Sequence, residues 1–167
     1  ECNFKCGYCH PKASSRYWKE IEDHGPYKMS STHRQDIDWF KVYKKEEENP
    51  YVDAWWKWWP EVSKTLNILR ITGGEPLMHK SLWELFEKLE ADPKPHIQIE
   101  VNSNMGVKPA LVEKLTKTVL RLKEKNCIKS FKLYTSIDTW GPRAEYARTG
   151  LDIKLWEENL SLLKIII

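Results

Sequence analysis

Three cysteines lie close together at the start of the chain, as Cys2, Cys6 and Cys9 in the spacing C-x3-C-x2-C. Cysteine thiolates are the usual ligands of iron–sulfur clusters. Three of them can hold three irons of a [4Fe-4S] cube and leave the fourth iron open to a small molecule. The alternative is structural zinc, which prefers four tetrahedral ligands and would have to recruit His10 or Cys127. The cysteines alone therefore predict either an open cluster or a zinc site.

Glycine and polar residues come where three predicted β-strands end. The strands are predicted from short apolar runs rich in β-branched residues, at 66–72, 97–102 and 130–137. The residues at their ends are Gly73, Gly74 and Glu75 for the first strand, Asn102 and Ser103 for the second, and Ser136 and Asp138 for the third. Each group has the composition of an ordinary turn or cap. Their common place at strand ends nevertheless favours one shared site.

Apolar residues recur at helical spacing after these strands, at 81–91, 109–125 and 151–164. Strands that alternate with helices are typical of parallel β/α units. The strands of such units all end on the same face, and in barrels of this kind that face carries the chemistry. We therefore predict an α/β fold whose strand ends bring the polar residues together.

Residues 12–60 form a polar, aromatic-rich segment, which we interpret as a helical insertion between the cysteines and the first predicted strand. One helix is predicted at 36–48, and a second passes through the tryptophans and ends at Pro60. Four of the nine tryptophans lie together there, as Trp55, Trp56, Trp58 and Trp59. Such aromatic density is more typical of a core or an interface than of a ligand site.

The composition excludes several classes of protein. The net charge of +3, from 27 basic and 24 acidic residues, is too small to indicate nucleic-acid binding. No apolar run approaches the roughly 18 residues that a membrane span needs. Three crowded cysteines are also unlike the spread cysteines of a secreted disulfide framework. We therefore expect a cytoplasmic protein with no membrane segment.

Two motifs together resemble those of the radical S-adenosylmethionine (radical SAM) superfamily. The first is the cysteine motif with the aromatic Tyr8 before its last cysteine, and the second is Ile-Thr-Gly-Gly-Glu-Pro-Leu at 71–77. Residues 144–152 and the tryptophan-rich run are similar to the subgroup with a C-terminal twitch or SPASM extension. The resemblance implies a partial (β/α)6 TIM-like barrel. Residues 1–167 would be its core, a fragment that lacks strand 1 before Glu1 and strands 5 and 6 after Ile167.

The resemblance also implies two cofactors, a [4Fe-4S] cluster and S-adenosylmethionine (SAM). In the superfamily an electron from the cluster cleaves SAM to a 5′-deoxyadenosyl radical, which abstracts hydrogen from a substrate. By this resemblance the cluster ligands are Cys2, Cys6 and Cys9. The implied SAM-binding residues are Gly73, Gly74 and Glu75 near the methionine amine, Ser136, Asp138, Asn102 and Ser103 near the ribose, Tyr8 near the adenine, and Arg148 or its competitor Arg143 at the carboxylate.

For an enzyme of this superfamily, the predicted substrate is a peptide or protein, and the alternative is a nucleoside or nucleotide precursor. The expected reductant is a protein such as flavodoxin or ferredoxin. Two hypotheses of other classes stay open. They are a zinc-binding protein-interaction module and a cluster protein that only transfers electrons.

Overall fold

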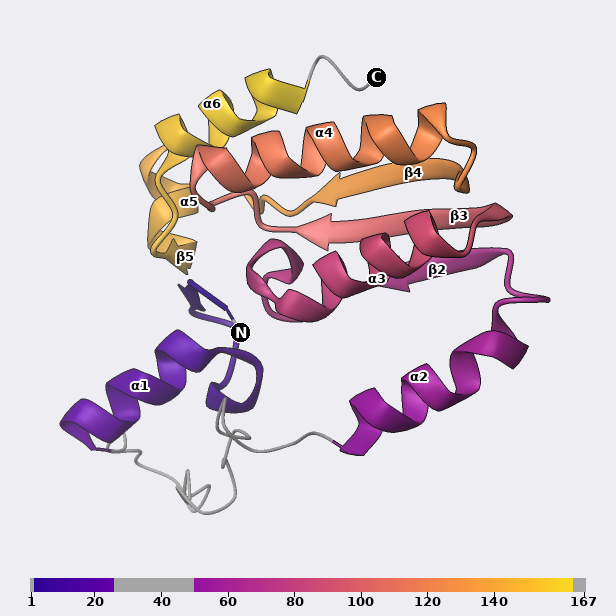
Figure 1. Cartoon of the computed structure of the whole chain (residues 1–167). Helices are drawn as coiled ribbons and strands as arrows, with labels where there is room; N and C mark the ends of the chain where they lie inside the picture. The colour runs from indigo at the N-terminus through magenta and orange to yellow at the C-terminus, as the bar shows by residue number, and fades with distance from the viewer. Residues whose placement is uncertain (1, 26–49, 164–167) are drawn as a thin grey trace.

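Three parallel strands form the main sheet, with β3 between β2 and β4 (Figure 1). The computed structural model describes residues 2–25 and 50–163. The register places Ile71 beside Val101 and Val101 beside Leu133, so the three strands end next to one another. The predicted α/β class and the alternation of parallel strands with helices are confirmed. In chain order the elements are β1 (Lys5–Cys6), η1 (Pro11–Ala13), α1 (Ser15–His24), α2 (Pro50–Val62), β2 (Ile68–Ile71), η3 (Pro76–Met78), α3 (Lys80–Ala91), β3 (Lys94–Ser103), α4 (Pro109–Glu124), β4 (Ile128–Thr135), α5 (Pro142–Ala147), β5 (Arg148–Thr149) and α6 (Ile153–Leu163).

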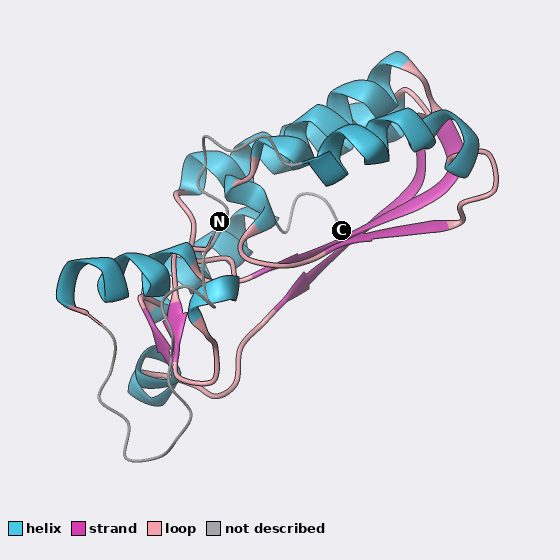
Figure 2. Ribbon diagram, turned by 90° about the horizontal axis from the view of Figure 1, so that it is seen from below, coloured by secondary structure: helices cyan, strands magenta, loops and turns pink. Residues whose placement is uncertain are grey.

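The hydrophobic core lies between this sheet and the helices α3 and α4, and α6 lies against α4. No described helix covers the opposite face of the sheet (Figure 2). Val101 of the sheet, Leu89 of α3 and Leu115 of α4 are all fully buried. Burying an apolar side chain of this size stabilises the fold by roughly 1.5–3 kcal/mol. The apolar spacing that predicted the two helices is therefore the spacing of their buried faces.

Two of the elements that extend beyond their predicted limits contain a proline. β3 begins at Lys94 and includes Pro95, because a register irregularity between Lys94 and Gln98 tolerates a residue without a backbone N–H. α2 continues through Pro60 to Val62 instead of ending at the proline, which lies in the last turn and removes only one backbone hydrogen bond there. The helix predicted at 36–48 lies outside the described residues.

Six elements were not located from the sequence, namely β1, β5, α1, α5 and the short helices η1 and η3. β1 and β5 pair antiparallel as a separate sheet of two residues per strand, which is too short to give a sequence pattern. The helix α1 lies within the segment 12–60 that was interpreted as a helical insertion, although no helix was placed at its residues. The helix α5 lies where the sequence analysis predicted no structure. In Figure 1, β1, β5 and α1 all lie toward the carboxyl ends of the parallel strands.

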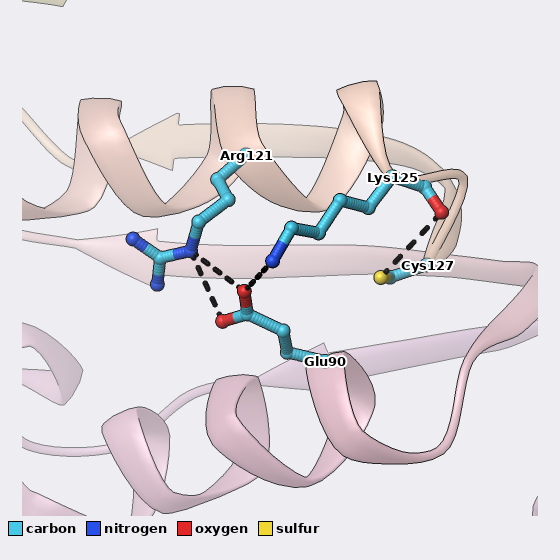
Figure 3. Close-up of polar contacts among 4 residues, drawn as sticks. All are labelled: Glu90, Arg121, Lys125 and Cys127. Carbon is cyan, nitrogen blue, oxygen red and sulfur yellow. Dashed lines mark hydrogen bonds and ion pairs between the residues drawn. The ribbon is translucent and has the colours of Figure 1, made fainter.

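An ion-pair cluster joins α3 to α4 at the other end of the sheet (Figure 3). The Glu90 carboxylate accepts hydrogen bonds from Lys125 Nζ at 2.6 Å and from Arg121 Nε at 3.0 Å. The bond from Lys125, with that from Arg121, holds the pKa of Glu90 below its usual range. Cys127 follows this cluster, and its carbonyl accepts the backbone N–H of Lys94 at 2.8 Å. Cys127 therefore lies where β3 begins, away from the strand ends.

None of the helices in the described part of the chain combines the length and the apolar character needed to cross a membrane.

Asn159 fixes α6 to the loop that follows β3. Its side chain is fully buried, and Nδ2 donates to the carbonyls of Met105 and Val107, each at 2.8 Å. We expect Asn159→Ala to lower the free energy of unfolding by about 1–3 kcal/mol, because buried carbonyls are left without a donor. Urea unfolding followed by circular dichroism measures this. The neighbouring exposed substitution Glu158→Ala should stay close to wild type, and equal losses in both variants would contradict the assignment.

Candidate functional site

The cysteine loop is irregular backbone that neighbouring elements hold in place. Cys6 pairs with Arg148 across the β1–β5 sheet. The Cys9 N–H donates to the Cys6 carbonyl at 2.9 Å and closes a turn. At the other end of the loop, the Cys2 N–H donates to Ser15 Oγ of α1 at 2.9 Å. The three cysteines are thereby fixed by β5 on one side and by α1 on the other.

The cysteines and the carboxyl ends of the parallel strands line one pocket of about 300 Å³. It combines residues from the cysteine loop, from the ends of β2, β3 and β4, and from β5. The residues predicted for the site that line it are Cys2, Cys6, Tyr8, Cys9, Gly73, Gly74, Asn102, Ser103, Ser136 and Arg148. Residues that the sequence analysis had assigned to one site, from positions far apart in the chain, are therefore brought together.

Gly73 and Gly74 turn the chain out of β2 at the edge of the pocket. Their φ angles are 89° and 56°, in the left-handed region that residues with a side chain rarely adopt. A Cβ added at Gly73 would meet no atom within 4 Å. The turn therefore requires glycine for its backbone conformation, and it leaves backbone polar groups accessible from the pocket.

Glu75 lies behind the pocket wall and has no exposed surface. Its Oε1 accepts from the Leu77 N–H at 3.1 Å and from Ser103 Oγ at 2.8 Å, and its Oε2 accepts from the Asn104 N–H at 2.7 Å. Burial raises the pKa of this carboxyl, and the three hydrogen bonds oppose that rise. The carboxylate joins the end of β2 to the end of β3. Its predicted contact with a bound ligand stays a prediction.

Asp138 is held by two other residues of the predicted site. Arg148 donates to it through Nε at 2.6 Å and Nη2 at 3.2 Å, and the Tyr8 hydroxyl donates at 2.9 Å. The bond from Arg148 holds the pKa of Asp138 below its usual range. Asp138 does not line the pocket. Its hydrogen bonds instead orient the side chains of Arg148 and Tyr8, which do line it. Arg143, the alternative to Arg148, is exposed and does not line the pocket.

The pocket wall contains an acceptor that lacks a donor. Asn102 Oδ1 is buried and has no hydrogen-bond partner among the described residues. A buried acceptor without a donor is costly, so a donor on a bound molecule fits this position. Burial also raises the pKa of the Cys2 and Cys6 thiols, so iron has to displace their protons on binding. Three thiols facing accessible backbone and an open acceptor suit an iron–sulfur cluster with a small polar ligand.

The described side chains give no support to the zinc alternative. No three His, Cys, Asp or Glu side chains within residues 2–25 and 50–163 are grouped so that they could hold a metal ion. Tetrahedral zinc requires such convergence, whereas a four-iron cluster binds each thiolate at a different iron. Cys127 cannot complete a zinc site either, since it lies at the start of β3, a strand of 10 residues. The length of that strand separates it from the pocket by roughly 30 Å.

Several residues that hold the site were missed in the sequence. Asn3 Oδ1 accepts from Asn104 Nδ2 at 2.8 Å across 101 positions of the chain. Gly106 lies so close to Phe4 that a Cβ there would be 2.2 Å from Phe4 Cζ. Gly106 is a turn signal that was available after the second predicted strand. The pairing of two asparagines so far apart has no local signal.

An α/β fold whose parallel strands end at a three-cysteine pocket defines an iron–sulfur protein with room for a small ligand. The sequence matches the Radical SAM superfamily over residues 1–164, and the chain belongs to this superfamily. Its members are enzymes that use a [4Fe-4S] cluster and SAM with a reductant. The predicted superfamily, cofactors and enzyme class are thereby confirmed.

One curated relative is similar in sequence to this chain. The GTP 3′,8-cyclase of Sulfurimonas denitrificans is 26% identical over 152 residues, which are 91% of this chain and 36% of the relative. The chain thus spans little more than a third of the length of that protein. No solved structure is a significant match to the chain.

Gly106→Ala tests whether the loop after β3 supports the cysteine loop. We expect the added methyl group to push Phe4 outward and to reduce iron uptake during anaerobic reconstitution, because Phe4 lies between Cys2 and Cys6. Iron per chain measures the effect. Adding Phe4→Leu to the variant should restore part of the uptake, since it removes the ring atoms that clash. Unchanged uptake in Gly106→Ala would contradict the packing argument.

Proposed function

We propose that this chain is the cofactor-binding core of a radical SAM enzyme that abstracts hydrogen from its substrate. The observation that carries the proposal is the pocket shared by three cysteines and the ends of three parallel strands. When bound there, the cluster and SAM supply an electron and a 5′-deoxyadenosyl group, so that cleavage of SAM yields methionine and a radical that takes a hydrogen atom from the substrate.

We propose the following roles for the pocket residues. Cys2, Cys6 and Cys9 hold three irons, which leaves one iron for the methionine part of SAM. The backbone at Gly73 and Gly74 is accessible to its amine, and the buried Oδ1 of Asn102 suits a hydroxyl or amine donor.

The other polar side chains complete the proposed SAM contacts. Ser136 lines the same pocket as Asn102 and suits a ribose hydroxyl. Ser103 also lines the pocket, but its hydroxyl already donates to Glu75 and accepts from the Met105 N–H. Arg148 suits the methionine carboxylate, because guanidinium and carboxylate form charge-assisted hydrogen bonds and Asp138 fixes the orientation of its side chain. Tyr8 is 64% exposed at the pocket mouth, where its ring can cover the adenine.

Two substrate classes remain as proposals. The sequence analysis favoured a peptide or protein, and no contact among the described residues bears on that choice. The similarity to a GTP 3′,8-cyclase supports the alternative, a nucleoside or nucleotide. The face of the sheet that carries Asn102 also carries Arg70, whose guanidinium pairs with Glu100 at 2.6 Å. A polar substrate suits that surface better than an apolar one.

The subgroup, the electron donor and the cellular compartment are also proposals. The twitch or SPASM subgroup is supported by the sequence likeness at 144–152, and an auxiliary cluster in such an extension would need further cysteines beyond this chain. A flavodoxin or ferredoxin suits the proposed need for single electrons. The cytoplasm suits a cluster that oxygen destroys.

Cys6→Ala tests the cluster ligands. We expect it to abolish 5′-deoxyadenosine formation and the visible absorbance of the reconstituted cluster, because the loop then offers two thiolates. Anaerobic chromatography and absorbance spectra measure both. Cys127→Ala is the matched control, since this cysteine lies at the opposite end of β3, and it should keep the cluster. Cleavage of SAM by Cys6→Ala would remove Cys6 from the ligand set.

The substrate alternatives are separated by one assay of the reconstituted, reduced enzyme. If the substrate is a nucleotide such as GTP, its addition should increase 5′-deoxyadenosine formation and GTP should be consumed in step with it. Liquid chromatography of both compounds in the same sample measures this. Formation of 5′-deoxyadenosine that is unchanged by GTP, and GTP that is recovered in full, would count against this nucleotide and leave the peptide proposal in place.

A further inference from the structure

A continuous hydrogen-bonded path joins the buried Glu75 to the cysteine loop. Glu75 Oε2 accepts from the Asn104 N–H at 2.7 Å. Asn104 Nδ2 then donates to Asn3 Oδ1 at 2.8 Å. Asn3 in turn donates through Nδ2 to the Gly106 carbonyl at 2.6 Å. The path thus reaches Asn3, which is the residue next to the proposed cluster ligand Cys2.

The loop that carries this path is rigidly defined. Ser103 Oγ donates to Glu75 Oε1 at 2.8 Å and accepts from the Met105 N–H at 3.0 Å. Asn104 Oδ1 accepts from the Gly106 N–H at 2.8 Å and closes a local turn. Met105 has a φ of 56°, which a non-glycine residue adopts only when its surroundings hold it there. A change in the position of the Glu75 carboxylate would therefore shift Asn104, because the hydrogen bonds within the loop hold its backbone in one conformation.

Burial makes the path costly to break. Glu75 has no exposed surface, Ser103 is 1% exposed and Asn104 is 7% exposed. Polar groups buried to this degree cannot exchange a lost partner for water. The three donors to the Glu75 carboxylate are the Leu77 N–H, the Ser103 hydroxyl at the end of β3 and the Asn104 N–H in the loop that follows. The carboxylate thereby joins η3 to the end of β3 and to the loop that follows.

We infer that Glu75 is a positioning residue, which fixes the cysteine loop through Asn104 and Asn3 and so sets how firmly the cluster is held. This inference rests on the proposed function, because it concerns the cluster that the three cysteines bind. It assigns Asn3 and Asn104 to the site as support for Cys2. It also gives Glu75 an effect on the cluster that does not depend on SAM.

The test is the rate at which the reconstituted protein loses iron to a chelator, bathophenanthroline disulfonate, in the absence of SAM. Residues that support metal ligands typically change metal affinity by 10- to 100-fold when replaced. We therefore expect Glu75→Gln, Asn104→Ala and Asn3→Ala each to release iron about 10-fold faster than wild type or more. Asn67→Ala is the matched control, since this exposed asparagine lies before β2, and it should release iron at the wild-type rate.

Two further measurements separate positioning from a general loss of stability. Asn3 is on a partly exposed loop, so Asn3→Ala should lower the thermal midpoint of the apoprotein less than Asn159→Ala does, while it changes the electron paramagnetic resonance spectrum of the reduced cluster. The double variant Asn3→Ala/Asn104→Ala should release iron no faster than the faster single variant, because both substitutions break one path. If the fold increase in iron release of the double variant equals the product of the two single increases, the two residues do not share a path.

The outcomes distinguish this inference from the proposed function. A wild-type protein that takes up no iron would overturn both. A wild-type protein that holds iron, with Glu75→Gln and Asn3→Ala releasing it at the wild-type rate, would overturn the positioning role and leave the proposed function intact. Glu75→Gln that weakens SAM binding while iron release stays at the wild-type rate would assign Glu75 to direct ligand contact instead.

Discussion

The parallel pairing of β2, β3 and β4 is the constraint on which the site depends. Because Ile71, Val101 and Leu133 lie in one row of the sheet, the residues that follow them emerge at one edge. Antiparallel pairing or a slip of one residue would point the same side chains to opposite faces. The helices α3 and α4 cover the apolar face of the sheet and secure this register. Figure 2 shows these helices as a layer on one side of the strands. The wall of the pocket is therefore a consequence of core packing.

The cysteine loop contributes the other wall, and it has little structure of its own. Its position is set by backbone pairing with β5, by Ser15 of α1 and by the asparagine contacts to the loop after β3. The polar groups behind the pocket, Glu75 and Asp138, have their oxygens occupied by protein donors. Side chains of this kind orient the groups that line a pocket. The pocket itself keeps thiols, glycine backbone and the Asn102 oxygen accessible.

Much of the fold and the membership of the site followed from the sequence. Apolar runs rich in β-branched residues located β2 to β4. Helical periodicity located α3 and α4, because the buried residues of a helix repeat at that spacing. The residues at the strand ends were found because parallel strands end on one face. The pairing of Cys6 with Arg148 and the link from Asn3 to Asn104 could not be found in this way. Both join distant segments through a few hydrogen bonds, and neither leaves a local pattern. The ligand contact that the sequence suggested for Glu75 stays a prediction, whereas its contacts to Leu77, Ser103 and Asn104 had no local signal.

The central claim is that three thiolates leave one iron of the cluster free to bind SAM directly. Electron paramagnetic resonance of the reduced protein, recorded before and after SAM is added, tests it most directly. A cluster with an open iron should change its g values when the amine and carboxylate of SAM occupy that iron. A spectrum of a fully assembled cluster that is identical with and without saturating SAM would contradict the account.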